Sequence, residues 1–215
     1  VHEAAHAWVS RRYGDFTAEQ QVTLNPIPHI RQEPIGTIAI PLLVFFLVGG
    51  KYTLGWASTP YDPLWARRNP RASGLMSLAG PMSNFLVAGI ALGIIWALVA
   101  AGQATITPWG WIPSFVTSTD SNLAFLGKFL SVLYFLNILL GVFNLIPVPP
   151  LDGAGIIQGF FPRSGYTRII ETYFAGGMAF VGILIAWLLF RFVGIKLVYW
   201  IGFQGLGVDI PMAKL

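Results

Sequence analysis

The sequence contains no cysteine, which excludes disulfide bonds, thiolate metal ligands and a cysteine nucleophile. Charged residues are also scarce: they make up 10% of the 215 residues, whereas soluble domains carry about 25%. Hydrophobic residues account for 55%. We therefore expect an integral membrane protein, in which any bound metal ion must be held by nitrogen and oxygen ligands.

Charge is missing altogether from several long stretches, and these predict the membrane spans. Residues 72–119 carry no charged side chain, and within them residues 75–101 exceed the ~20 apolar residues that a helix needs to cross a bilayer. Residues 35–48 are short for a crossing and contain Pro41, which fits a re-entrant or surface-lying segment at least as well. The remaining predicted spans are residues 1–13, as part of a helix, 127–147 and 173–193.

These spans predict an all-α polytopic membrane protein, a helical bundle that forms a single domain over residues 1–215. Residues 15–34 mix β-branched and polar residues with proline, which predicts a small β element at the membrane surface. The strand expected around residues 22–24 could hold an extended substrate by strand addition. Because a motif at residues 2–6 would otherwise lie on a fraying helix end, we expect upstream sequence that completes the first helix.

The basic residues favour one orientation in the membrane. If residues 35–48 do not cross, segments 10–34, 50–74 and 150–172 share one face, whereas segment 102–125 on the other face has no Lys or Arg. The positive-inside tendency makes the first of these faces cytoplasmic. The basic residues on that face are Arg11, Arg12, Arg31, Lys51, Arg67, Arg68, Arg71, Arg163 and Arg168. They are dispersed rather than gathered in a stripe, which argues against nucleic acid as a partner.

The motif HEAAH near the start of the chain predicts a metal site. On a helix, His2 and His6 are four residues apart and project from one face, where two imidazoles can bind one metal ion. Glu3 lies beside them and could take a proton from an attacking water without being a ligand. This HExxH arrangement is typical of zinc-dependent hydrolysis, although manganese, cobalt or iron could occupy the same ligands.

Two histidines need a third protein ligand, and the nearby sequence does not supply one. The extended HExxHxxGxxH pattern would require glycine and histidine where the chain has Val9 and Arg12. The remote candidate is Asp152, which ends a long uncharged run in NLIPVPPLDG and would be costly at that place unless it is solvated or coordinated. Alternatively, Asp152 caps the helix that follows.

With HEAAH on an apolar helix, AGPMSN in the next span and NLIPVPPLDG at the end of another, the chain resembles the site-2 protease family of intramembrane zinc metalloproteases, in its compact bacterial form without a PDZ domain. The resemblance implies that His2, His6 and Asp152 bind one zinc ion per chain and that Glu3 is the catalytic base. Asn144 and Asn84 match two further polar positions of the family.

The roles of the two asparagines stay open. Asn144 could stabilise the oxyanion of the attacked carbonyl or bond to another helix, and Asn84 could contact substrate or bond between helices. His29 is expected to be a structural loop histidine.

The resemblance also implies that the protein cleaves a peptide bond in transmembrane or membrane-proximal segments of membrane-protein substrates. The expected setting is the bacterial cytoplasmic membrane, with the site toward the cytoplasm. The main alternative is a metal-binding membrane protein without proteolysis, either a transporter or a regulatory pseudoenzyme, and a weaker one is a structural scaffold. Glu3 discriminates between them, because hydrolysis needs it and metal binding does not.

Overall fold

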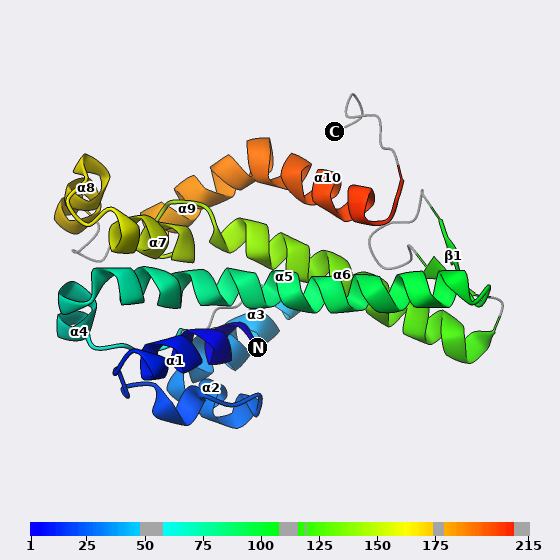
Figure 1. The fold of residues 1–215 in the computed structure, drawn as a ribbon, viewed down its shortest axis with the longest axis horizontal. Helices are drawn as coiled ribbons and strands as arrows, with labels where there is room; N and C mark the ends of the chain where they lie inside the picture. Colours follow the sequence, from blue (N-terminus) through cyan, green and yellow to red (C-terminus); the bar gives the residue numbers. More distant parts are fainter. Residues whose placement is uncertain (48–57, 108–115, 119, 174–178, 209–215) are drawn as a thin grey trace. The chain divides into compact units, whose positions relative to one another are not determined.

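The computed structural model of the chain describes residues 1–47, 58–107, 116–118, 120–173 and 179–208. The described residues are predominantly helical (Figure 1), which confirms the all-α class. Contacts group them into two compact units: Val1–Gly80 with Gly155–Ser164, and Pro81–Ala154 with Gly165–Leu215.

The first unit, unit 1, contains the N-terminal helices and most of α7. Its elements are α1 (His2–Arg12), η1 (Glu19–Gln21), α2 (Pro26–Gln32), η2 (Ile35–Ala39), α3 (Ile40–Leu47), α4 (Pro63–Arg68), the start of α5 (Pro70–Ala100) and α7 (Asp152–Phe160) from Gly155 onward. The second unit, unit 2, contains the rest of α5, β1 (Thr105–Ile106), β2 (Val116–Thr117), α6 (Ser121–Asn144), α8 (Gly165–Tyr173), α9 (Ala179–Leu189), η3 (Phe190–Gly194) and α10 (Ile195–Gly205).

Among the described residues, three helices are long and apolar enough to cross a membrane: Pro70–Ala100, Asn122–Asn144 and Val181–Gly205. The first two helices overlap the predicted spans, residues 75–101 and 127–147. The third differs from the predicted 173–193, because the helix continues past Arg191 and Lys196. Both side chains are exposed, and long basic side chains can keep their charges in a polar layer while their stems cover apolar surface. Residues 174–178 lie outside the described part of the chain.

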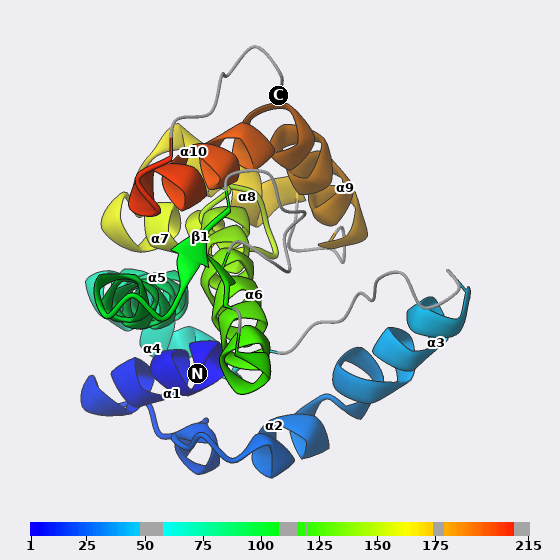
Figure 2. The same cartoon turned by 90° about the vertical axis from the view of Figure 1, so that its right-hand side faces the viewer.

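Residues 35–47 are helical, and they follow a sharp bend. The pair Pro26–Gln32 and Ile35–Leu47 is bent by 109°, which fits either a broken span or a re-entrant segment. In Figure 2 the chain continues from α2 upward and to the right into α3. Pro34 lies at the break, where proline restricts the preceding residue, Glu33, away from helical geometry.

The strand expected around residues 22–24 is wrong. A short 3₁₀ helix at Glu19–Gln21 precedes these residues and α2 follows them. The side chain of Asn25 accepts a hydrogen bond from the backbone N–H of Ile27 at 3.0 Å, and Pro26 occupies the first helical turn. Both features start a helix, so strand addition at this edge is not available. The β element of the described residues is instead the antiparallel pair β1–β2, with Thr105 opposite Thr117.

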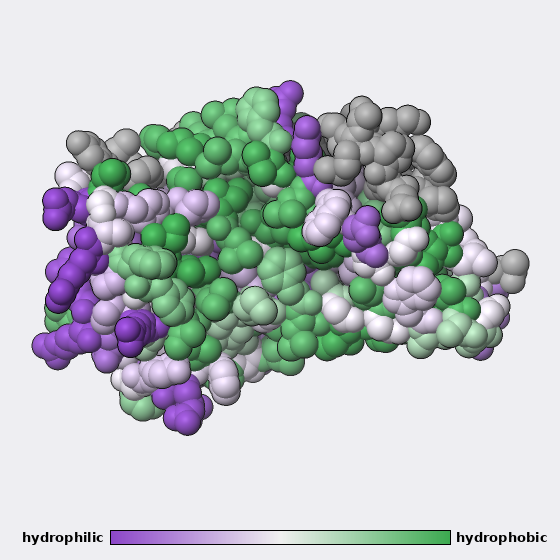
Figure 3. Space-filling model, turned by 45° about the horizontal axis from the view of Figure 1, so that its top comes forward, coloured by the Kyte–Doolittle hydropathy of each residue, from purple (hydrophilic) through white to green (hydrophobic). Residues whose placement is uncertain are grey.

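The core of unit 2 is built from the apolar sides of its long helices. Ala91 and Ile95 of α5, Ile138 of α6 and Val198 of α10 are buried in one cluster. The hydroxyl of Tyr134 donates a hydrogen bond to the carbonyl of Gly202 at 2.9 Å, so that α6 and α10 are joined by a polar contact as well as by packing. Large apolar side chains remain exposed along the spans, and the face drawn in Figure 3 is extensively hydrophobic, as a lipid-facing surface is expected to be.

In unit 1, α7 packs closely against the start of α5. A Cβ added at Gly159 would overlap the backbone of Gly74 and lie 2.6 Å from the carbonyl oxygen of Pro70, and one added at Gly155 would overlap the side chain of Ser77. Small residues allow helix backbones to approach in this way. The contacts run antiparallel, with Gly159 against Gly74 and Gly155 against Ser77.

This packing predicts that Gly159→Ala destabilises the protein by about 1–3 kcal/mol, because the added methyl group meets backbone that cannot rotate away. Gly165→Ala is the matched control, since a Cβ there has nothing within 4 Å. Thermal unfolding of the detergent-solubilised protein measures both. Equal unfolding temperatures for the two variants would contradict the described packing.

Candidate metal centre

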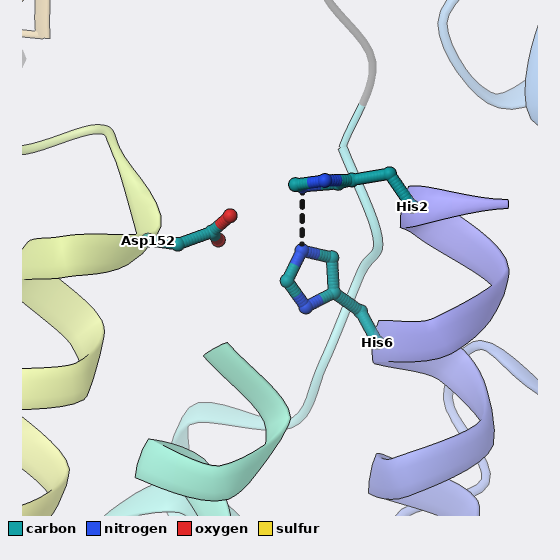
Figure 4. Close-up of side chains that lie close together, drawn as sticks. All are labelled: His2, His6 and Asp152. Carbon is teal, nitrogen blue, oxygen red and sulfur yellow. Dashed lines mark hydrogen bonds between the residues drawn. The ribbon is translucent and has the colours of Figure 1, made fainter. Parts of the chain in front are cut away.

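The two histidines of HEAAH lie on one face of α1, as their spacing predicts. Their Nε2 atoms are 3.0 Å apart, and the two rings meet edge to face with centroids 4.7 Å apart (Figure 4). His6 is 6% exposed and His2 is half-buried. Two imidazoles are thus held together with the same nitrogen of each ring directed to a common point.

A backbone carbonyl fixes the ring of His6. Nδ1 of His6 lies 2.6 Å from the carbonyl oxygen of Met76 in α5. Because a carbonyl can only accept, Nδ1 carries the proton and Nε2 of the neutral ring is the nitrogen that carries a lone pair. Histidines that bind metals usually donate their second ring N–H in this way, which orients the ring and raises its basicity. With this tautomer of His6, the hydrogen bond between the two rings runs from Nε2–H of His2 to Nε2 of His6.

Gly80 of α5 provides the space that the two rings occupy. A Cβ at this position would lie 2.5 Å from Nε2 of His2 and closer still to Nε2 of His6. Pro81 follows inside the helix, and since proline has no N–H, the carbonyl of Ser77 loses its helical donor there. The AGPMSN motif therefore places a side-chain-free position of a spanning helix directly against the imidazole pair, which sequence patterns alone did not indicate.

Glu3 is held by a residue that the sequence analysis did not identify. The hydroxyl of Thr59 donates a hydrogen bond to Oε2 of Glu3 at 2.8 Å. Glu3 and Thr59 are both half-buried. They are 56 residues apart, and Thr59 belongs to no motif, so no local signal could have linked them.

Asp152 is the first residue of α7, and Figure 4 draws its carboxylate with the two histidines. A negative charge in the first turn of a helix is favoured by the helix dipole. The preceding NLIPVPPL segment is tied within unit 2 by Tyr166, whose hydroxyl donates to the carbonyl of Pro147 at 2.8 Å. Burial raises the pKa of Tyr166 above its usual value. A Cβ at Gly153 would overlap the carbonyl of Leu145, so glycine is needed directly after Asp152.

Three other polar residues were candidates for the site: Asn84, Asn144 and His29. Asn84 is 3% exposed within α5. The side-chain amide of Asn144 donates to the carbonyl of Leu140 in its own helix at 3.0 Å. His29 lies in α2 rather than in the expected loop, and its ring contacts the carbonyl of Thr23 through Nε2 at 3.1 Å. Substrate or oxyanion roles for the two asparagines stay predictions.

The imidazole pair fits a zinc ion. Two nitrogen ligands at about 2.0–2.1 Å from a tetrahedral zinc ion are about 3.3 Å apart, close to the 3.0 Å between the Nε2 atoms of His2 and His6. His2, His6 and Asp152 would offer one ligand atom each, two ring nitrogens and one carboxylate oxygen. Such a set suits zinc in a catalytic site, where three protein ligands leave a position open.

Apolar spanning helices and an HExxH motif, with its histidines paired and its glutamate beside them, together define a membrane metallopeptidase. The model of peptidase family M50 matches residues 1–189, and the chain belongs to that family. This membership confirms the resemblance stated from the motifs, and with it the assignment as a zinc metallopeptidase.

Relatives with curated names agree with this assignment. The chain is 34% identical to YwhC of Bacillus subtilis over 84% of this chain and 73% of the relative, and that relative carries the name of a zinc metalloprotease. It is 29% identical to Rip2 of Mycolicibacterium smegmatis, named in the same way, over 93% of this chain and 68% of the relative. No solved structure matches the chain.

The position of Gly80 predicts that Gly80→Ala lowers metal affinity at least about tenfold, because the added methyl group displaces both rings. Gly89→Ala in the same helix is the matched control, since a Cβ there has nothing within 4 Å. Zinc content after equilibration with a graded chelator series measures the effect. If both variants retain zinc equally, the rings do not bind the ion from this position.

Proposed function

We propose that this zinc metallopeptidase cleaves peptide bonds within transmembrane or membrane-proximal segments of other membrane proteins. The carrying observation is the imidazole pair of His2 and His6 held against Gly80 of α5, a helix apolar and long enough to span a membrane. A hydrolytic site on such a helix can reach peptide bonds that a peptidase in bulk water cannot.

Asp152 is the proposed third ligand of a single zinc ion. Asp152 ends a long uncharged run, where a carboxylate is costly unless it is solvated or coordinated. Two histidines need a third protein ligand to complete a zinc site. The carboxylate also satisfies the need for an oxygen or nitrogen ligand in a chain without cysteine.

In the proposed reaction, the side chains of the motif move protons around the scissile bond. Zinc, when bound by His2, His6 and Asp152, supplies a Lewis acid that polarises the carbonyl and makes water a better nucleophile at neutral pH. Glu3 takes the proton of the attacking water on its carboxylate and passes it to the leaving amine nitrogen. The Met76 carbonyl orients the ring of His6 through the hydrogen bond to Nδ1, so this ligand is held in place before metal binds.

The substrate must present an unwound peptide. A transmembrane helix keeps its carbonyls in internal hydrogen bonds, so a helical substrate has to open locally before a carbonyl can be attacked. Asn84 and Asn144 are proposed to hydrogen-bond such an opened segment or its oxyanion. Because Asn144 already donates to Leu140 in its own helix, only its second amide hydrogen and its carbonyl oxygen are available for this role.

The proposed location is the bacterial cytoplasmic membrane, with the site toward the cytoplasm. The basic residues of segments 10–34, 50–74 and 150–172 support this orientation through the positive-inside tendency. The partners are then the lipid bilayer and single-span or multi-span protein substrates.

Glu3→Gln is expected to bind zinc like the parent and to lower the rate of cleavage by about 100-fold or more, because the amide cannot accept the proton of water. Glu19→Gln is the matched control, since Glu19 pairs with Arg11 on the surface at 3.3 Å. Zinc content and cleavage of a panel of single-span substrates in proteoliposomes measure both properties. Zinc binding by the parent without cleavage of any substrate would instead favour a metal-binding membrane protein without proteolysis.

A further inference from the structure

Residues 58–62 carry side-chain and backbone contacts to several parts of unit 1. The central contact is the hydrogen bond from the Thr59 hydroxyl to Oε2 of Glu3, at 2.8 Å. The same hydroxyl oxygen lies 3.1 Å from the backbone carbonyl oxygen of Glu3. Since a hydroxyl has one hydrogen, it favours the shorter contact, in which the acceptor is a carboxylate and the bond is correspondingly stronger.

The contact restricts a side chain that would otherwise move freely. A glutamate has several rotatable bonds, and an isolated glutamate on a helix loses considerable rotamer entropy when it is fixed. With Oε2 engaged by Thr59, rotation of the side chain is limited and Oε1 is left for another partner. A general base must lie within hydrogen-bond reach of the proton that it abstracts, so fixing one oxygen determines where the other can act.

Thr59 is itself held from both sides. The preceding residue, Ser58, donates its hydroxyl to Oε1 of Glu33 at 2.5 Å. Beyond Thr59, the backbone N–H of Asp62 donates to Oδ2 of Asp15 at 3.1 Å. Asp15 is 4% exposed.

The anchor at Asp15 is also well ordered. Its Oδ1 accepts the backbone N–H of Thr17 at 3.0 Å and the hydroxyl of the same residue at 2.5 Å. Thr59 therefore lies on a short stretch with a fixed point on each side, and its hydroxyl is presented to Glu3 by backbone that is itself restrained.

We propose that Thr59 is a positioning residue for the reaction, which holds Oε2 of Glu3 so that Oε1 faces the attacking water. This inference rests on the proposed role of Glu3 as general base. In this role Thr59 needs no contact with the metal ion or with substrate. Its loss should lower the rate of the chemical step and leave metal binding and substrate binding unchanged.

The test compares Thr59→Val, which keeps the shape and removes the hydroxyl, with Thr59→Ser, which keeps the hydroxyl. Thr59→Val is expected to lower kcat by about 10- to 100-fold with unchanged KM and zinc content, because a small misplacement of a catalytic group costs that much. Thr59→Ser should recover most of kcat. The matched control is Thr172→Val, whose hydroxyl donates within its own helix to the carbonyl of Arg168 at 2.8 Å.

The outcomes separate this inference from the proposed function, since the parent and Glu3→Gln are measured alongside. One outcome is that the parent cleaves, Glu3→Gln does not, and Thr59→Val has the kcat of the parent. That outcome overturns the positioning role of Thr59 and supports Glu3 as the general base. A change in KM alone, or equal losses in the Val and Ser variants, also overturns it. If Thr59→Val fails to bind zinc or to fold, Thr59→Ala is compared with Thr59→Ser by the same measurements and criteria.

Discussion

The hydrogen bond from Nδ1–H of His6 to the Met76 carbonyl is the contact on which the site depends. It selects the tautomer of a buried imidazole and points Nε2 toward His2, 3.0 Å away. The Met76 carbonyl belongs to helix α5. Because a carbonyl oxygen has two lone pairs, it can accept from His6 and still accept the N–H of its own helix. Gly80, one turn further along α5, leaves room for both rings. Helix α5 thus orients the ring of His6 through the carbonyl of Met76 and leaves room for both imidazole rings at Gly80.

This arrangement explains why ionisable groups can sit on an apolar scaffold. Buried polar groups are costly unless they are hydrogen-bonded or coordinated, and two members of the motif have hydrogen-bond partners outside α1. His6 donates to Met76, and Glu3 accepts from Thr59. Within unit 1, glycines let α7 from Gly155 onward pack closely against the start of α5.

Much of the fold and the centre of the site could be predicted from sequence, because both depend on short-range rules. Uncharged runs predict spans through a length requirement, and HEAAH predicts a shared helix face through the period of the helix. The strand expected around residues 22–24 was wrong because the cap formed by Asn25 and Pro26 outweighed the β-branched composition. Thr59 and Gly80 were missed for a different reason. Their roles come from contacts between distant parts of the chain, which no local pattern records.

The most direct test of the account is the zinc K-edge X-ray absorption spectrum of the purified protein loaded with one equivalent of zinc. The account predicts two imidazole ligands per zinc ion at about 2.0–2.1 Å, with oxygen completing the shell and no sulfur. A spectrum with one imidazole or none would contradict it, because His2 and His6 would then not share the ion.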